Sequence, residues 1–371
     1  MNNMKNISLM DLPGQYRLVE KQVLPKIKEV LKSGRYIMGP EVTNFEANFA
    51  KYCNAKYCIA TSSGTESLYL SLMALGVGKG DEVITVPNTF TATAEVIVLV
   101  GATPVFCDID PETANIDAKT LKSKITKKTR AVIPVHFHGN PVDLDEIYKI
   151  TKPKKIAVIE DSAQAHGGRY KGKIIGSSSS EAICFSFHPV KNLGAFGDGG
   201  AIVTNNKKLE NILRKLINHG REDHYFHSLI GTTGRLDALQ GAILNIKLKH
   251  LNNWIKLKAK LVEHYRKKLS GVCKFIETTK NAQSAHHVVA ILTPKRDELA
   301  KYLKSFGIET GIHYPISLHL QPAYKFLGYK EGDFPYAEKY AKETLSLPLY
   351  PHMKQKDIDF VITKILQFYG K

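Results

Sequence analysis

The sequence predicts an α/β fold with a mainly parallel sheet, followed by a smaller α+β domain. Over the first two thirds of the chain, short β-branched runs alternate with helix-like segments. Several of these runs lack polar alternation, as strands covered on both faces do. Because 371 residues suffice for two domains, we expect a large domain over residues 1–254 and a small one over residues 255–371. We expect the amino-terminal segment to pack on the small domain.

The elements follow in order along the chain. Residues 65–75 have apolar side chains at helical spacing behind a Ser/Gly/Thr start, which predicts a helix. The predicted strands are bounded by Gly, Pro or Asp and read "DEVITVP", "TPVFCDID", "RAVIPVHFHG", "KIAVIED", "AICFSF" and "GAIVTN". "AEVIVLVG" and "LDEIYKIT" predict helices between them. One long helical pattern over residues 236–269 then leads to strand-like "HVVAIL" and helix-like "KRDELAKYLKSFG".

Charge and cysteine content narrow the class of protein. The formal net charge of +17 favours a polyanion, which includes nucleic acid, an acidic membrane surface and phosphorylated small molecules. The basic residues are spread along helix-like stretches, which is typical of solvated faces, so we expect no nucleic-acid partner. Five cysteines without CxxC spacing predict free thiols in a reducing compartment. The longest apolar stretch, "VIVLVGATPVF", is too short for a membrane span. We therefore expect a cytoplasmic protein without membrane contact.

Three clusters of residues could carry chemistry. In "TSSGTES", residues 61–67, small residues precede a helix and leave backbone amides free at its positive end, which suits a phosphate or is an ordinary helix cap. In "VIEDSAQAHGG", Asp161 ends an apolar strand, where it either caps the next helix or faces a basic ring nitrogen of a ligand. In "FSFHPVKN", Lys191 follows a strand that ends at Ser186. A lysine among apolar and backbone groups loses proton affinity and becomes a nucleophilic amine.

Together the three clusters match what pyridoxal 5'-phosphate (PLP) requires. Its phosphate needs hydrogen-bond donors, its pyridinium nitrogen needs a negative partner, and its aldehyde needs an amine. The sequence supplies these in the order of phosphate seat, carboxylate and lysine.

The chain resembles the DegT/StrS family of sugar-nucleotide aminotransferases, which are fold type I PLP enzymes. The motifs that carry the resemblance run from about residue 8 to the carboxyl terminus and include "RYIMGPEV", "GATPVFCDIDPET", "IEDSAQAHG", "FSFHPVKNLGAFGDGGAIVTN", "RLDALQGAIL" and "GIHYPISLHLQPAY". The resemblance implies that Lys191 forms a Schiff base with PLP and later moves a proton, and that Asp161 pairs with the pyridinium nitrogen. It further implies ring and phosphate contacts from Phe90 and Ala163 on the two ring faces, Gln164 at the phenolic oxygen, and Gly64, Thr65 and Ser186 at the phosphate.

The resemblance also implies a reaction and partners. L-Glutamate would donate its amino group, leaving 2-oxoglutarate and pyridoxamine phosphate, which would then aminate a keto group on a nucleotide-linked sugar. Of the members known, the motifs most resemble those that convert dTDP-3-keto-6-deoxyhexoses into 3-amino-3,6-dideoxy sugars, as used in lipopolysaccharides or other surface polysaccharides. UDP-linked 3-keto-uronates and 4-keto sugar nucleotides are the alternatives. Substrate contacts are expected from His313, Tyr314 and His319.

The family works as homodimers with active sites at the subunit interface. Relatives often have an asparagine in a "GYNSRLD"-like stretch that reaches the neighbouring subunit's phosphate. This chain has Thr233 there, and His138 stands where many relatives have tyrosine.

Three rival functions are less well supported by the residues. A PLP-dependent sugar dehydratase would have a histidine in place of Lys191. A DNA-binding regulator would need a recognition motif, and neither helix-turn-helix nor zinc-finger spacing occurs. His136 and His138 could bind a metal from one strand face, but no third ligand lies nearby in sequence, so we expect none.

Overall fold

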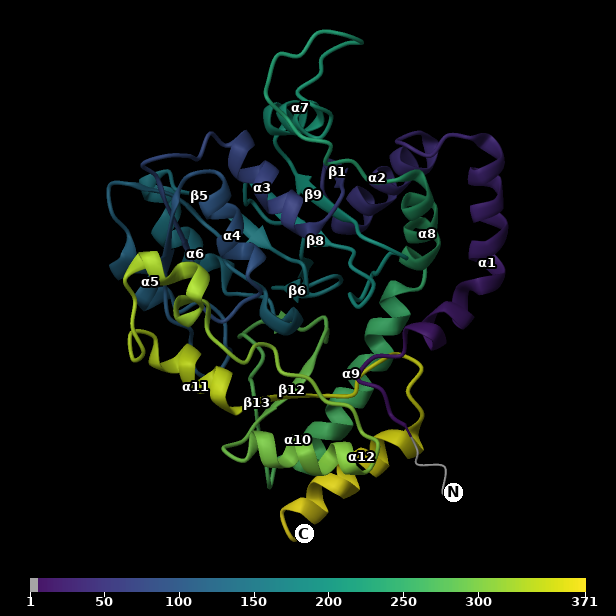
Figure 1. Ribbon diagram of the computed structural model, residues 1–371, viewed down its shortest axis with the longest axis vertical. Coiled ribbons are helices and arrows are strands. Elements are labelled where there is room, and N and C mark those ends of the chain that lie inside the picture. Colours follow the sequence, from purple (N-terminus) through teal and green to yellow (C-terminus); the bar gives the residue numbers. More distant parts are fainter. Residues whose placement is uncertain (1–5) are drawn as a thin grey trace.

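The computed structural model describes residues 6–371 and is built around one seven-stranded sheet (Figure 1). The strand order is β1-β9-β8-β5-β4-β2-β3. The strands span β1 Tyr57–Thr61, β2 Glu82–Thr85, β3 Thr103–Phe106, β4 Thr129–Val132, β5 Ala157–Asp161, β8 Ala182–Ser186 and β9 Gly200–Thr204. The pairs from β8 to β3 are all parallel, while β9 runs antiparallel to both of its neighbours. The predicted mainly parallel, mixed sheet is confirmed.

Apolar side chains cover both faces of this sheet, which explains why its strands lack polar alternation. In β8, Ile183 belongs to one apolar cluster and Cys184 to the cluster on the opposite face. The helices associated with this sheet are α2 Pro40–Cys53, α3 Gly64–Ala74, α4 Ala92–Leu99, α5 Ala118–Lys124, α6 Leu144–Thr151 and α7 Lys207–Leu216. Helix α3 packs against β8 and β9, and α2 packs against β1.

The helical pattern over residues 236–269 is two helices, not the single one that we predicted. Helix α8 spans Ala238–Leu248 and α9 spans Leu251–Leu269. The amides of Lys249 and His250 bond to carbonyls three residues back, which tightens the turn and ends α8. The break redirects the chain, since α8 packs against α1 (Leu12–Ser33) and α2, whereas α9 reaches α12 (Gln355–Phe368).

A second apolar core lies below the sheet in Figure 1. Its antiparallel sheet has the order β10-β12-β13, with β10 Lys274–Phe275, β12 Val289–Leu292 and β13 Thr344–Leu347. Helices α9, α12 and α10 (Arg296–Ser305) contribute to this core. Ile7 also belongs to it and pairs with Ile308 in a parallel bridge, so the amino-terminal segment packs here.

The two cores do not divide at one point of the sequence. Helix α9 has Leu251 in the core of the large sheet and Leu261 in the second core. Residues 318–340 return to the large sheet, where Phe334 and Tyr340 of the segment around α11 (Pro335–Glu343) are buried. The division at residues 254 and 255 stays a prediction.

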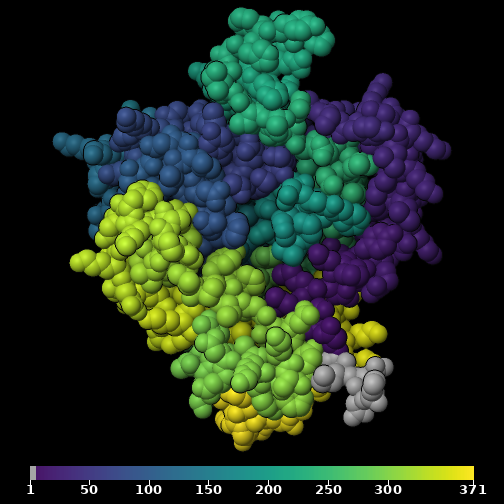
Figure 2. All heavy atoms as spheres, in the orientation of Figure 1, coloured from purple at the N-terminus to yellow at the C-terminus, as the bar shows by residue number. Residues whose placement is uncertain are grey.

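Smaller elements complete the chain. A third sheet has the order β11-β6-β7, with β6 Arg169–Tyr170, β7 Lys173–Ile174 and β11 Ala282–Gln283. Short 3₁₀ helices are η1 Phe137–Gly139, η2 Lys152–Lys154, η3 Leu318–Leu320 and η4 Pro322–Leu327. After α7 the chain forms an exposed arm over residues 221–230, which projects at the top of Figure 2. None of the helices among residues 6–371 has the length and apolarity to span a membrane.

Candidate active site

Three of the predicted clusters meet at one edge of the large sheet. Asp161 is the last residue of β5 and pairs in parallel register with Cys184 of the neighbouring strand β8. Ser186 ends β8, and the start of α3 packs against it at Gly64. In parallel strands this edge holds the carboxyl ends, where α/β proteins usually bind ligands.

Asp161 is held in a fixed orientation by its neighbours. Its side chain is 6% exposed. The Thr93 hydroxyl donates to Asp161 Oδ2 at 2.7 Å, and the Ala163 amide donates to Oδ1 at 3.1 Å. A buried carboxylate is stabilised by such donors. Sequence reasoning missed Thr93, which lies in α4, far along the chain from Asp161.

Lys191 has the properties of a nucleophilic amine. It lies in the loop after β8, where its own amide donates to the His188 carbonyl at 2.8 Å. Burial lowers the pKa of its ammonium group from 10.5 to about 8, and the charge of Asp161 acts in the opposite direction. Within residues 6–371, no residue hydrogen-bonds to Lys191 Nζ. The amine is therefore free to react with a ligand.

The start of α3 and the end of β8 form a seat that fits a phosphate. The Ser63 side chain caps the helix by accepting from the Glu66 amide at 3.0 Å. The amides of Gly64 and Thr65 have no hydrogen-bond acceptor in the part of the chain that the structure describes. A Cβ at Gly64 would lie 2.6 Å from Ser186 Cβ, so glycine is what allows the helix start to approach the Ser186 hydroxyl.

The predicted ring contacts surround the same edge. Gln164 Oε1 accepts from the His138 amide at 2.6 Å, which directs Nε2 toward the Tyr314 hydroxyl, 3.5 Å away. The ring centroids of Phe90 and Tyr314 are 5.9 Å apart, and Phe90 is 55% exposed. Phe90 is thus an accessible aromatic face at the edge of the site, and Ala163 follows Asp161 by two residues.

Several buried histidines lie within electrostatic range of Lys191. Burial, followed by the Lys191 charge, lowers the pKa of His313 to about 4 and that of His166 to about 3. His313 Nδ1 is 2.8 Å from the Ser346 hydroxyl, and its ring lies 6.1 Å from that of His138. These side chains are neutral imidazoles at neutral pH. The structure thus brings His313, Tyr314 and His138 to the cluster.

His319 does not join this cluster. Its ring is 2% exposed and packs against Phe334, with centroids 4.7 Å apart. Its Nε2 lies 3.0 Å from Glu338 Oε1. These contacts tie His319 to the core beside α11. Thr233 is placed elsewhere too, where its hydroxyl accepts from Arg235 at 3.0 Å.

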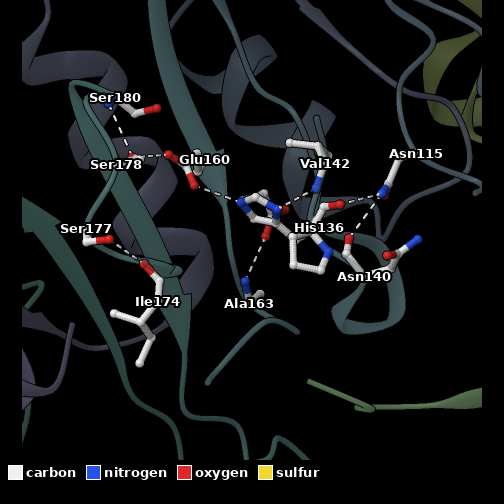
Figure 3. A network of polar contacts seen from close by, with 12 residues as sticks. Asn115, His136, Asn140, Val142, Glu160, Ala163, Ile174, Ser177, Ser178 and Ser180 are labelled. Atoms are coloured by element: carbon white, nitrogen blue, oxygen red, sulfur yellow. Dashed lines mark hydrogen bonds and ion pairs between the residues drawn. The ribbon is translucent and has the colours of Figure 1, made fainter. Parts of the chain in front are cut away.

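The "HFHG" segment is not the strand with two histidines on one face that its spacing predicts. It follows β4, and His138 lies in η1 with a φ of 55°. His136 is fully buried, with Nε2 2.8 Å from Glu160 Oε2 and Nδ1 accepting from the Val142 amide at 3.1 Å (Figure 3). Ser178, from the "SSSS" turn, donates to the other Glu160 oxygen. No group of three or more metal-ligating side chains occurs in residues 6–371.

The contact between His136 and Glu160, drawn in Figure 3, links the segment after β4 to β5. Glu160 directly precedes Asp161, and alternate side chains of a strand face opposite ways. The His136 amide also donates to the Asp161 carbonyl at 3.0 Å. This network fixes the strand end that carries Asp161, and no sequence motif announced it.

Comparison with known proteins agrees with this arrangement. The model of the DegT/DnrJ/EryC1/StrS aminotransferase family matches residues 18–366. The chain is 44% identical to the "Pleiotropic regulatory protein" of Geobacillus stearothermophilus, over 98% of this chain and 99% of that protein. It is 40% identical to the UDP-2-acetamido-2-deoxy-3-oxo-D-glucuronate aminotransferase of Pseudomonas aeruginosa, covering 96% and 98%. It is 39% identical to the dTDP-3-amino-3,4,6-trideoxy-alpha-D-glucose transaminase of Streptomyces venezuelae, covering 98% and 96%.

A solved structure shares the whole fold. The crystal structure of S. venezuelae DesV in complex with a ketimine intermediate superposes with a TM-score of 0.97 at 38% identity. The match covers 99% of each chain.

Proposed function

The chain belongs to the DegT/DnrJ/EryC1/StrS aminotransferase family, and we propose that it aminates a dTDP-linked 3-keto-6-deoxyhexose with L-glutamate as amino donor. The family and the relatives named for nucleotide-sugar substrates make the chain a PLP-dependent aminotransferase of nucleotide sugars. The observation that carries the proposal is the half-buried Lys191, with its lowered pKa, close to the sheet edge that holds the Asp161 carboxylate.

The residues at this edge fit PLP. When bound, PLP supplies an aldehyde that exchanges amino groups and a ring that withdraws electrons. Asp161 would hold the ring nitrogen, and the amides of Gly64 and Thr65 with the Ser186 hydroxyl would hold the phosphate. Gln164 Nε2 would donate to the phenolic oxygen, since Gln164 Oε1 is occupied by the His138 amide. Phe90 and Ala163 would enclose the two ring faces.

Lys191 would have two tasks. Its amine would hold PLP through the aldehyde, and once released it would accept and donate a proton beside the reacting carbon of the substrate. A pKa of about 8 suits both tasks, because an appreciable fraction of the amine is unprotonated near neutral pH. The neutral imidazole of His313 and the Tyr314 hydroxyl lie beside the site and are the proposed sugar contacts.

The same geometry supports a second substrate. The Pseudomonas aeruginosa relative, at 40% identity, is named for a UDP-linked 3-oxo-glucuronate, so a UDP-linked 3-keto-uronate is the alternative. Two relatives named for dTDP-linked 3-amino sugars, from Streptomyces venezuelae at 39% identity and from Aneurinibacillus thermoaerophilus at 38%, support the dTDP-linked sugar. The pyridoxamine form, incubated with a panel of dTDP- and UDP-linked 3-keto and 4-keto sugars, should aminate the dTDP-3-keto sugar fastest. Preference for a UDP-linked or a 4-keto sugar would contradict the proposal.

We propose further that the enzyme works as a cytoplasmic homodimer. The arm over residues 221–230 presents Tyr225, 89% exposed, and Ile230, 88% exposed, which suits burial against a second copy. The five cysteines are free thiols, which supports a reducing compartment. Sedimentation should give twice the mass of the chain.

Lys191→Ala separates this proposal from the rival functions. Borohydride should attach PLP to Lys191 in the parent protein, and the variant should lose both the adduct and amino transfer. A dehydratase would eliminate water from the sugar without needing this lysine. The Geobacillus relative is named a regulatory protein. A regulator that acts through DNA would bind DNA tightly with or without PLP. An adduct on another lysine would overturn the role given to Lys191.

A further inference from the structure

A buried lysine of α9 contacts the loop that carries Lys191. Lys258 projects from the middle of α9 and is 6% exposed. Its Nζ donates to Asn192 Oδ1 at 2.8 Å and to the His287 carbonyl at 3.0 Å. Asn192 directly follows Lys191 in the chain. Lys258 therefore anchors the loop by a hydrogen bond to the residue next to Lys191.

Asn192 is fixed from its other end as well. It is 7% exposed, and its Nδ2 donates to the Ala285 carbonyl at 2.6 Å. Each polar atom of the amide is thus paired with a different part of the fold, Oδ1 with α9 and Nδ2 with the segment before β12. A side chain held at both ends leaves the preceding residue little freedom to shift.

The segment over residues 285–287 also reaches the other side of the site. The Ala285 amide donates to the Gly139 carbonyl at 2.8 Å, and the His287 amide donates to the His138 carbonyl at 3.1 Å. The His138 amide in turn donates to Gln164 Oε1 at 2.6 Å. One continuous set of hydrogen bonds therefore links the Lys191 loop to Gln164, the proposed contact of the phenolic oxygen.

The burial of Lys258 lowers the stability of the fold. Burial lowers the pKa of its ammonium group from 10.5 to about 7, and no carboxylate of residues 6–371 forms an ion pair with it. Burying an ionisable group without a counter-charge destabilises a fold, and an apolar side chain of similar volume is often better for stability alone. Stability therefore does not account for a lysine here, whereas its two hydrogen bonds do.

We propose that Lys258 is a positioning residue that acts through Asn192 to hold Lys191 in a fixed position relative to Gln164. The inference rests on the proposed function, in which Lys191 is the residue that binds PLP. Lys258 itself contacts neither the cofactor nor the sugar. Its removal leaves Asn192 Oδ1 and the His287 carbonyl unpaired in the interior, so the loop must move to rehydrate them.

The test compares two buried lysines. Lys258→Met removes the hydrogen bonds of Lys258 to Asn192 and His287. Lys247→Met is the matched control, because Lys247 is 1% exposed, has a pKa lowered to about 7 by burial, and donates at 2.8 Å to another amide oxygen, that of Gln15. The first readout uses the cofactor-free proteins, in which the rate of Lys191 acetylation by acetic anhydride is followed against pH by mass spectrometry. The second is the pH titration of the visible absorbance of the PLP-loaded proteins.

Lys258→Met should raise the pKa of the Lys191 ammonium group by about one unit, because a loosened loop admits water and relieves the burial that lowers it. The midpoint of the visible titration should shift, and kcat should fall about tenfold for a displacement of a fraction of an ångström. Lys247→Met should change neither midpoint. Equal shifts in both variants, or no shift in Lys258→Met, would overturn the inference.

Asn192→Ala tests the same bridge from its other side and carries the test alone if Lys258→Met does not fold. It should reproduce the shift, and the double variant should show little more than either single change. Additive shifts would overturn the route through Asn192. Borohydride mapping of the parent protein keeps the two proposals apart. An adduct on Lys191 with unchanged midpoints refutes only the positioning role, whereas an adduct elsewhere refutes the proposed function.

Discussion

Replacing Gly64 by alanine should weaken PLP binding through the phosphate alone. The added Cβ would lie 2.6 Å from Ser186 Cβ and 3.1 Å from Ser186 Cα. Carbon atoms in contact are about 3.5–4.0 Å apart, so the start of α3 must move away from Ser186 by about 1 Å. The backbone of Gly64 has no positive φ, so the contact with Ser186, not backbone strain, decides the outcome.

The size of the effect follows from the donors at the phosphate seat. The amides of Gly64 and Thr65 and the Ser186 hydroxyl come from two elements that the new Cβ would push apart. A hydrogen bond to a charged group contributes about 1.5–3 kcal/mol. Losing one such bond should raise the Kd for PLP about ten- to hundredfold. Alanine also favours helix by about 0.5–1 kcal/mol, so thermal stability is the less informative measurement.

The assay is a titration of the cofactor-free protein with PLP and with pyridoxal, which lacks the phosphate. Gly64→Ala should lose affinity for PLP and keep its affinity for pyridoxal. Gly271→Ala is the control, since a Cβ there meets no atom within 4 Å. If Gly64→Ala binds PLP as tightly as the parent, or loses both ligands equally, the phosphate seat is placed wrongly.

Three further predictions concern buried polar groups. Thr93→Val removes the 2.7 Å hydrogen bond to Asp161 and should lower the free energy of unfolding, measured in urea, by about 1–3 kcal/mol. It should also weaken the binding of PLP and of pyridoxal equally in titrations, and unchanged affinities would contradict this prediction. Burial lowers the pKa of Lys247 in the folded state from 10.5 to about 7, so protonation of this side chain disfavours the fold and the free energy of unfolding should rise between pH 7 and pH 10. In urea unfolding, the free energy of unfolding of Lys247→Met should rise less over this range than that of the parent protein. Parallel curves for the two proteins would refute this prediction. His319→Gln should lower stability by breaking the contact with Glu338 while leaving the KM for the sugar unchanged in steady-state assays, and a raised KM would show that His319 contacts substrate after all.

The sequence was sufficient to predict the strand ends at which the candidate catalytic residues lie. Asp161 and Lys191 could be placed because each follows a short apolar run, and parallel strands bring such ends to one edge. The three clusters together then predicted the cofactor, and the family motifs predicted the reaction. Local patterns contain this information, since burial on both faces of a sheet leaves a mark within a few residues.

What the sequence did not reveal depends on contacts between distant segments. Thr93 and Asp161 are separated by 68 positions, and no spacing rule relates them. Lys258 looked like one of many helix lysines, and only packing of α9 against the segment before β12 buries it. His319 sits in a family motif, yet Glu338, which fixes its ring, comes from a helix whose return to the large core has no local signal. The break before α9 has neither Gly nor Pro to announce it.

The antiparallel strand β9 affects how this architecture can change over time. Ser186, the last residue of β8, lies opposite Gly200, the first residue of β9, so the excursion that contains Lys191 departs from and returns to the same rung of the sheet. Insertions or deletions within that excursion leave the strand register intact, because both of its ends are anchored to each other. Strand pairing therefore fixes where the excursion begins and ends, whereas the position of the reactive amine within it depends on the contacts that Asn192 makes outside the sheet.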